Sequence, residues 1–225
     1  MSAFRSFLVA LCLSLSVLHA DDPSLDFSRW EKDIATLEAK KNAPNHSPGA
    51  LLFVGSSSIR LWDLPASWPK EKTINQGFGG SLLADTLHFF DRIVTPFQPR
   101  AILVYAGDND IAKGRTAEQV IEDFRALVRL WEARLPQTPL VFIAIKPSRK
   151  RWELWPEMKR ANEAIAKICE DTPGLHYADI ATPMLEKADG APGEEWFLKD
   201  GLHLSPMGYA RWTEVINQVL SQAKP

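Results

Sequence analysis

Short apolar runs alternate along the chain with longer stretches in which apolar residues recur every three or four positions. Runs of this length are typical of buried parallel strands, and the longer stretches are typical of helices with one apolar face. The predicted strands are Ala50–Val54, Thr73–Asn75, Ala101–Tyr105, Leu140–Ile145 and His176–Asp179. This alternation predicts an α/β fold, namely a three-layer α/β/α, flavodoxin-like sandwich with a mainly parallel, five-stranded sheet.

Local signals define the helices between these strands. Thr116, with Gln119 three residues later, predicts a capping box at the start of a helix whose apolar stripe is Val120, Phe124, Leu127 and Trp131. Two further helices are predicted over residues 81–94 and 158–168, the second with Pro156 in its first turn. Ser205-Pro206 opens the last helix, and its predicted buried face is Tyr209, Trp212, Ile216 and Val219.

The N-terminal 20 residues differ from the rest of the chain. Arg5 precedes the apolar stretch Phe7–Val17. Leu18-His-Ala20 follows that stretch and stands directly before two aspartates. This pattern predicts a secretory signal peptide cleaved after Ala20, so the protein is expected to be secreted or periplasmic. The apolar stretch is too short to span a bilayer comfortably, so no stable membrane insertion is expected after cleavage. The predicted organisation is a signal peptide over 1–20, an N-terminal helix and linker over 21–49, and one α/β domain over 50–225.

The composition limits which classes of binding partner we expect for this protein. A chain of 225 residues with 45% hydrophobic content and a net charge of −2 is ordinary for a globular domain and does not attract a polyanion. The one basic cluster, Lys146–Arg151, has no basic helix around it, so we expect a solvated loop and no nucleic-acid binding. Cys169 is the only cysteine after the predicted signal, and we expect it to pack in the core.

Three residue types that support acyl transfer occur in suitable places. Asp200 and His203 are three residues apart, a spacing that lets a tight turn aim a carboxylate and an imidazole at one serine. Ser57 is the candidate nucleophile because it follows the first predicted strand, in Gly55-Ser-Ser-Ser58, where a tight turn should begin. In this arrangement His203 takes the proton of Ser57 and Asp200 orients the imidazole.

Two further segments offer hydrogen-bond donors at the same edge of the sheet. Asn75-Gln-Gly-Phe-Gly-Gly80 follows the second predicted strand, and Gly107-Asp-Asn-Asp110 follows the third. Glycine exposes its backbone N–H, and asparagine supplies a carboxamide donor; both suit a developing oxyanion.

In their order and local contexts, Ser57, Gly80, Asn109 and His203 resemble the four signature residues of the SGNH hydrolases, also called GDSL esterases and lipases. The resemblance covers roughly residue 50 to the C-terminus. It implies an oxyanion hole formed by the backbone N–H groups of Ser57 and Gly80 and the side chain of Asn109. The family's Gly-Asp-Ser reads Gly55-Ser56-Ser57 here, so the turn lacks a carboxylate, although the Ser56 hydroxyl is able to accept a backbone hydrogen bond.

Structural roles compete with these functional ones. The glycines at 77, 79 and 80 are also what a sharp turn between a strand and a helix requires. For Asp108 and Asp110 we favour loop or capping roles, and for Ser56 and Ser58 roles in the turn. The sequence contains no Gly-x-Ser-x-Gly elbow, phosphate-binding loop or His-Glu-x-x-His zinc motif. No cofactor or metal is therefore implied.

The substrate is inferred from aromatic residues near the predicted site: Trp62, Trp152, Trp155 and Trp196-Phe197. Such rings either stack on sugars at the rim of a cleft or pack in the core. The favoured substrate is a small-molecule or carbohydrate-linked ester with a short acyl group, such as acetyl. Two alternatives stay open: a lipolytic enzyme of the lysophospholipase or thioesterase kind, and a secreted glycan-binding module without activity, suggested by the Ser56 departure.

Overall fold

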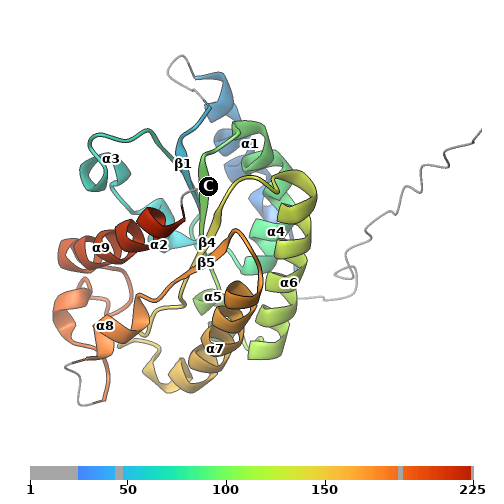
Figure 1. Ribbon diagram of the computed structural model, residues 1–225. Helices are drawn as coiled ribbons and strands as arrows, with labels where there is room; N and C mark the ends of the chain where they lie inside the picture. The colour runs from blue at the N-terminus through green and yellow to red at the C-terminus, as the bar shows by residue number, and fades with distance from the viewer. Residues whose placement is uncertain (1–24, 44–47, 187–189, 224–225) are drawn as a thin grey trace, which may run out of the picture.

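A parallel sheet lies between two layers of helices in the computed structural model, which describes residues 25–43, 48–186 and 190–223 (Figure 1). The strands are β1 (Leu51–Gly55), β2 (Thr73–Gly77), β3 (Ala101–Tyr105), β4 (Leu140–Ile143) and β5 (Leu175–Ala178). They are all parallel, in the order β2-β1-β3-β4-β5. This confirms the predicted five-stranded α/β/α sandwich. The predicted signal peptide and residues 44–47 of the predicted linker lie outside the described residues.

The central strands are apolar throughout because both of their faces are covered. Every residue of β1, β3 and β4 is buried. Successive side chains of a strand point to opposite faces, so Ile102 and Val104 pack in one core while Leu103 and Tyr105 pack in the other. Burial on both sides explains why these strands appear in the sequence as unbroken apolar runs.

One helical layer contains α1 (Glu31–Ala39), α4 (Leu83–Ile93), α6 (Ala117–Arg134) and α7 (Trp155–Asp171). The predicted stripe of α6 is confirmed, since each of its four apolar residues is buried. The capping box also forms, because the Gln119 N–H donates to Thr116 Oγ1 at 3.3 Å and the Thr116 N–H donates to Gln119 Oε1 at 2.9 Å. Short elements on this side are η1 (Ser28–Trp30), η2 (Lys40–Asn42), η3 (Thr95–Phe97), α5 (Asp108–Ala112) and η4 (Trp152–Leu154).

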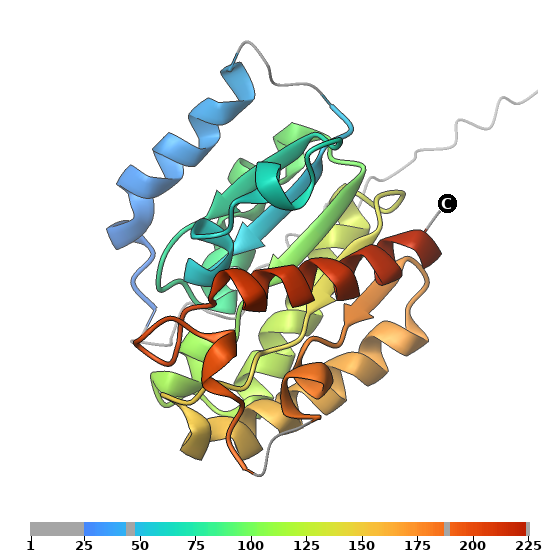
Figure 2. The same cartoon turned by 90° about the vertical axis from the view of Figure 1, so that its left-hand side faces the viewer.

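The opposite layer contains α2 (Ser57–Arg60), α3 (Leu64–Ser67), α8 (Ala181–Leu185), η5 (Glu194–Trp196) and α9 (Pro206–Gln222). Figure 2 shows α9 crossing the face of the sheet. Ser205 caps this helix as expected, accepting the Gly208 N–H at 3.2 Å. Trp212 of α9 is fully buried against Tyr105, with ring centroids 4.9 Å apart.

Trp62 corrects the expectation of an aromatic rim. Its side chain is only 4% exposed and lies 5.1–5.7 Å from the rings of Phe53, Trp68, Tyr209 and Trp212. Phe197 is also buried, whereas Trp152, Trp155 and Trp196 keep partial exposure. Trp62 therefore belongs to the core between α9 and the sheet.

Several strand and helix ends differ from the predicted ones by one to three residues for local reasons. The strand predicted to reach Ile145 ends at Ile143, because Asn162 of α7 bonds both the N–H and the carbonyl of Ile145 at 2.8 Å. Helix α4 begins at Leu83 and not at Ser81, because Asp85 accepts the Leu82 N–H at 2.8 Å. In both cases a side chain replaces the backbone partner that would have continued the element.

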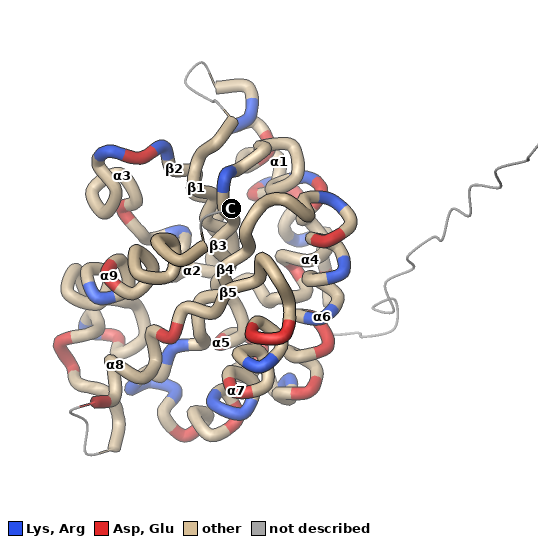
Figure 3. The backbone as a smooth tube through the Cα atoms, in the orientation of Figure 1, with Lys and Arg blue, Asp and Glu red and all other residues tan. Residues whose placement is uncertain are grey.

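Charged residues lie on the helices and loops, and the five strands contain none. Figure 3 shows acidic and basic positions intermingled over both helical layers. Within the described ranges, no helix is long and apolar enough to cross a membrane.

Candidate active site

The turn after β1 positions Ser57. Gly55 has φ of +135°, and a Cβ built on it would lie 1.9 Å from the carbonyl oxygen of Tyr105, so only glycine fits. The Ser56 N–H donates to that same oxygen at 3.0 Å. Ser57 then begins α2, which places its side chain beyond the carboxyl end of β1, at the edge of the sheet where sites form in this architecture.

The backbone holds this turn without help from the Ser56 side chain. Ser56 is buried, yet its hydroxyl has no hydrogen-bond partner among the described residues. Its carbonyl accepts the N–H groups of Ile59 and Arg60 at 3.0 and 3.1 Å. The turn is therefore formed even though Ser56 stands where the family has aspartate, and the side-chain hydrogen bond considered from the sequence is absent.

Two glycines at the end of β2 and in the loop after it lie beside Arg60 of α2. A Cβ on Gly77 would lie 2.3 Å from the backbone nitrogen of Arg60, and one on Gly79 would lie 2.7 Å from Arg60 Nε. Gly80 differs from these two. Its φ of +86° lies in the region that favours glycine, but a Cβ built on it would meet no atom within 4 Å. Close approach to the Arg60 backbone explains Gly77, whereas the neighbour of Gly79 is the movable end of the Arg60 side chain, and the turn itself explains Gly80.

His203 and Asp200 lie on a loop between η5 and α9. An antiparallel bridge between Phe197 and Leu204 closes this loop, and the Leu198 N–H donates to the His203 carbonyl at 2.7 Å. Gly201, with φ of +63°, makes the tight turn between the two side chains. Its carbonyl accepts the Lys150 N–H at 3.1 Å, which ties the loop to the segment after β4.

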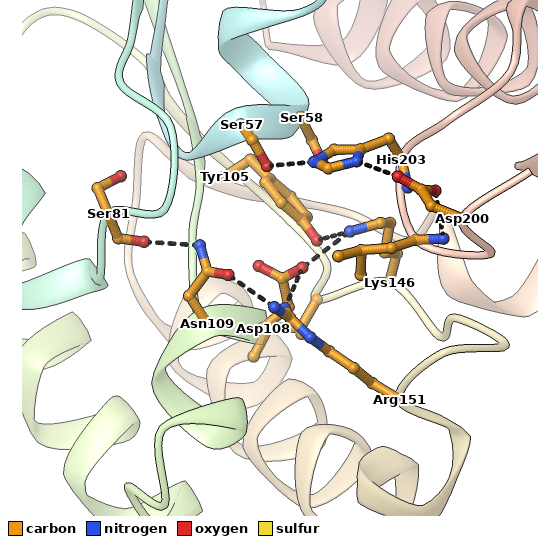
Figure 4. A network of polar contacts seen from close by, with 12 residues as sticks. Ser57, Ser58, Ser81, Tyr105, Asp108, Asn109, Lys146, Arg151, Asp200 and His203 are labelled. Atoms are coloured by element: carbon orange, nitrogen blue, oxygen red, sulfur yellow. Dashed lines mark hydrogen bonds and ion pairs between the residues drawn. The ribbon is translucent and has the colours of Figure 1, made fainter. Parts of the chain in front are cut away.

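The structure brings Ser57, His203 and Asp200 into one hydrogen-bonded line (Figure 4). His203 Nε2 lies 3.2 Å from Ser57 Oγ, and His203 Nδ1 lies 2.5 Å from Asp200 Oδ2. With the Nδ1 proton directed at the carboxylate, Nε2 is the ring nitrogen able to accept the serine proton. This is the geometry that activates a serine as a nucleophile.

Asp200 is ionised in this arrangement. Partial burial raises the pKa of its carboxyl, but the hydrogen bond from His203 and those from the backbone N–H groups of Leu202 and His203 outweigh burial and lower the pKa to about 2. Both backbone bonds are 2.9 Å long. A carboxylate that stays charged favours a positive imidazole, as proton transfer from serine requires.

Asn109 lies beyond β3, the strand adjacent to β1. It is 8% exposed, and its Nδ2 donates to the Ser81 carbonyl at 3.0 Å (Figure 4). Gly55 pairs with both Gly77 and Tyr105 in the sheet, so the loops carrying Ser57, Gly80 and Asn109 leave the strands at one level. The parallel register thus gathers the predicted oxyanion donors around the nucleophile turn.

Sequence reasoning missed a buried group of charges behind Asn109. Lys146 is 2% exposed and its Nζ lies 2.8 Å from Asp108 Oδ2 and 2.9 Å from the Tyr105 hydroxyl. Arg151 Nη1 lies 3.1 Å from the same carboxylate oxygen. The expectation of a solvated loop over Lys146–Arg151 is therefore wrong at both of its ends, and Asp108 is an ion-pair partner rather than a free loop residue.

Asp108 keeps its charge despite deep burial. Burial raises the pKa of this carboxyl, but the charges of Lys146 and Arg151 more than offset it and hold the pKa below its usual value. Asp110, two residues on, caps α4 as expected by accepting the Leu83 N–H at 3.2 Å. Burial raises the pKa of Asp110 to about 7, although Arg115 opposes the shift.

Other reactive side chains have ordinary surroundings. His88 stacks on Phe27 with ring centroids 4.0 Å apart. Cys169 is buried, as expected, and burial raises the pKa of its thiol to about 12. Among the residues placed by the structure, no three His, Cys, Asp or Glu side chains are grouped closely enough to hold a metal ion.

Known proteins resemble this chain over most of its length. The human platelet-activating factor acetylhydrolase IB subunit alpha1 is 27% identical over 179 residues, which cover 76% of this chain and 74% of that protein. The alpha2 subunit from Rattus norvegicus is 23% identical, covering 92% of this chain and 90% of that protein.

Solved structures share the fold at low identity. A GDSL-like lipase from Bacteroides thetaiotaomicron has a TM-score of 0.73 and 20% identity, over 88% of this chain and all of that chain. A carbohydrate esterase family 3 protein from Talaromyces cellulolyticus has a TM-score of 0.60 and 16% identity, over 77% of this chain and 97% of that chain.

The model of the GDSL-like Lipase/Acylhydrolase family matches residues 55–211, which run from the end of β1 into α9 and include every candidate site residue. The resemblance to the SGNH hydrolases seen in the sequence is thereby confirmed. The chain belongs to the GDSL-like lipase/acylhydrolase family and is an ester-hydrolysing enzyme.

Proposed function

We propose that this protein is a serine esterase that removes short acyl groups, acetyl above all, and that Ser57, His203 and Asp200 are its catalytic residues. The observation that carries the proposal is the line of contacts from Ser57 Oγ to His203 Nε2, 3.2 Å, and from His203 Nδ1 to Asp200 Oδ2, 2.5 Å. A nucleophile, a base and an orienting carboxylate in contact are the parts that acyl transfer needs.

In the first half-reaction His203 Nε2 takes the hydroxyl proton while Ser57 Oγ attacks the ester carbonyl carbon. The negative charge on the former carbonyl oxygen is met by the backbone N–H groups of Ser57 and Gly80 and by Asn109 Nδ2. His203 returns the proton to the departing alcohol, leaving an acyl-serine. Water, deprotonated by His203, then hydrolyses that ester and restores the free serine.

Two observations support a short acyl group. The two relatives described above are named platelet-activating factor acetylhydrolase subunits, and one structural neighbour is named a carbohydrate esterase. The catalytic side chains are also open to solvent, with 28% of His203 and 40% of Asp200 exposed. An open site suits a small acyl group on a bulky alcohol, because a long alkyl chain gains most from an enclosed apolar groove.

A sugar alcohol is favoured by the half-buried pair Trp152 and Trp155. Their rings are nearly parallel, with an interplanar angle of 12° and centroids 6.4 Å apart. They follow Arg151, which contacts Asn109, and aromatic faces of this kind stack on sugar rings. The carbohydrate ester is therefore the first substrate class to test.

The first test is Ser57→Ala, with Ser56→Ala as its matched control. Loss of the nucleophile should lower kcat on 4-nitrophenyl acetate by about four to six orders of magnitude. Ser56→Ala should keep most of the activity, since the Ser56 hydroxyl bonds no described residue. Labelling by a serine-directed phosphonate, located by peptide mass spectrometry, should fall on Ser57. Labelling at Ser56 or Ser58 instead would refute the assignment.

A panel of esters tests the substrate class. Acetylated sugars should be hydrolysed with a higher kcat/KM than esters of long-chain acids. Faster cleavage of lysophospholipids or long-chain thioesters would favour the lipolytic alternative. Binding of glycans without turnover of any ester would favour the inactive binding module.

A further inference from the structure

Asn109 is backed by a cluster of charges that the proposed mechanism does not use. The cluster comprises Asp108, Lys146 and Arg151, with the Tyr105 hydroxyl bonded to Lys146 (Figure 4). Lys146 and Asp108 have side-chain exposures of 2% and 6%, and Arg151 of 18%. Burying ionised groups is costly, so such a cluster persists where opposite charges face one another, as they do here. Asp108 Oδ1 and Arg151 Nη1 nevertheless have no hydrogen-bond partner among the described residues. Two cations share one carboxylate, which leaves these three side chains with one net positive charge.

Arg151 links this cluster to the proposed oxyanion hole. Its Nη1 lies 3.1 Å from Asp108 Oδ2, while its Nη2 donates to Asn109 Oδ1 at 3.0 Å. A guanidinium can make both contacts at once because its donors lie in one rigid plane. The compact ammonium of a lysine has no such fork and reaches one of the two partners at a time.

The two partners of the Asn109 carboxamide determine which way it faces. Oδ1 accepts from Arg151, and Nδ2 donates to the Ser81 carbonyl, each over 3.0 Å. A half-turn of the amide would set its NH2 group against the guanidinium and its oxygen against a carbonyl oxygen. The observed orientation therefore holds Nδ2 on the side of Ser81, next to Gly80. One Nδ2 proton is used by Ser81, which leaves the second for a substrate.

Arg151 also changes the strength of that donor. A cation bonded to Oδ1 draws electron density away from the amide nitrogen, and hydrogen bonds in a chain polarise one another. A net positive charge behind the amide further favours an anion in front of it. Both effects grow when the carbonyl oxygen of the substrate becomes negative.

We propose that Arg151 is a positioning residue for ester hydrolysis: it fixes and polarises the Asn109 carboxamide so that Nδ2 serves the oxyanion, and Asp108 holds Arg151 in place. This inference rests on the oxyanion role proposed above for Asn109. Arg151 itself does not touch the reacting atoms. Its influence belongs to the transition state, where the oxyanion forms, and not to the binding of the ground-state ester.

The test compares Arg151→Lys and Arg151→Gln with the native enzyme on 4-nitrophenyl acetate. Both variants should lower kcat by about tenfold to a hundredfold, less than complete loss of an oxyanion donor, with KM within about threefold of native. Arg151→Lys keeps a cation beside Asp108, so it provides a folded variant if Arg151→Gln is unstable. Native kcat in a folded Arg151→Lys would overturn the proposal, and so would a change confined to KM.

Arg149→Gln is the matched control from the same segment. Arg149 contacts the Pro192 carbonyl at 3.1 Å and Glu194 at 3.2 Å, away from Asn109. Its replacement should leave kcat unchanged. An equal fall in kcat for Arg149→Gln would overturn the proposal, since it would show that any lost charge in this segment has the same effect.

A double-mutant cycle separates positioning from an independent role. If Arg151 acts through Asn109, then Asn109→Ala combined with Arg151→Lys should have the same kcat as Asn109→Ala alone. If the double variant has a lower kcat than Asn109→Ala alone, so that the two substitutions reduce kcat by independent factors, the inference is overturned. Failure of the proposed function is distinguishable, because Ser57→Ala would then keep its activity. If only this inference fails, Ser57→Ala is inactive, but the effects of Asn109→Ala and Arg151→Lys on the activation free energy add.

Discussion

Asp200 shows how one side chain performs several tasks in this site. Its Oδ1 accepts the N–H groups of Leu202 and His203, and its Oδ2 faces His203 Nδ1. The same residue thus shapes the turn and sets the tautomer of the imidazole. The three-residue spacing between Asp200 and His203 is what allows both contacts.

We predict that Asp200→Asn lowers kcat by about 10³- to 10⁴-fold without unfolding the protein. The amide occupies the same space, but it no longer stabilises a positive imidazole and favours the tautomer with its proton on Nε2. Steady-state kinetics with 4-nitrophenyl acetate, with circular dichroism as the control for folding, measure the effect. Activity within tenfold of native would show that another carboxylate orients His203.

Residues whose roles depend on near neighbours in sequence were predictable. The sequence predicts that Ser57, Asp200 and His203 lie together, as they do in the structure, because a strand end and a short spacing define their positions. Lys146 and Arg151 were misjudged because their partner, Asp108, is 38 residues from Lys146 and 43 from Arg151. For Trp62 the sequence leaves rim and core open for the same reason, since the ring that covers it, Trp212, lies on α9.

At the scale of elements, the contact between β1 and β3 determines where the nucleophile turn can form. Gly55 lies against the Tyr105 carbonyl with no room for a side chain, and its backbone is in the positive-φ region. The strands are therefore joined at their carboxyl ends by direct backbone contact.

Gly55→Ala should destabilise the protein by at least about 3 kcal/mol, because both steric overlap and positive φ oppose it. Gly114→Ala is the matched control: φ is +87° there, but nothing lies within 4 Å of the added Cβ. Its cost should be about 1 kcal/mol, from backbone strain alone. Urea unfolding of the two variants gives both values. Equal costs would mean that the close approach to Tyr105 is unimportant.

Asp110 connects α5 to the start of α4, and its raised pKa makes this junction sensitive to pH. The pKa is about 7 in the folded protein, against roughly 3.9 for an unfolded chain. Folding therefore favours the protonated form. This contribution to stability is fully present below about pH 4 and is lost as pH rises through about 7.

Asp110→Asn should remove this dependence, because an amide oxygen still accepts the Leu83 N–H but does not ionise. Between pH 5 and pH 8 the Tm of the variant should rise relative to native by about 5–10 °C, equivalent to about 2–3 kcal/mol. Thermal melts at several pH values measure the difference. A difference in Tm that stays constant over this range would contradict the raised pKa of the buried Asp110 carboxyl.

Periodicity predicted the elements well, but the ends of the elements depend on tertiary contacts. The stripe of α6 and the five strands follow from patterns of apolar residues within each segment. The end of β4 does not, because it is set by Asn162, which lies on α7. A single sequence contains no local signal for a side chain that reaches in from another layer.

At the scale of the whole molecule, the predicted layers and the family agree with the structure, while the fate of the N-terminus is a prediction. We propose that residues 1–20 are removed on export and that the mature protein begins at Asp21. Intact-mass measurement of protein recovered from outside the cytoplasm should give a chain starting there. Recovery of a chain that retains Met1–Ala20 would contradict this.

The hydrogen bonds of Tyr105 indicate which parts of the site can be altered separately. Its carbonyl accepts the Ser56 N–H, and its hydroxyl accepts from Lys146 in the cluster that supports Asn109. The turn that carries Ser57 and the cluster behind Asn109 are thus both bonded to Tyr105 at the end of β3, whereas His203 and Asp200 lie on a separate loop closed by the Phe197–Leu204 bridge. Under the proposed function, we therefore expect substitutions within residues 198–203, other than at Asp200 and His203, to alter the preference for the alcohol while the preference for the acyl group stays unchanged.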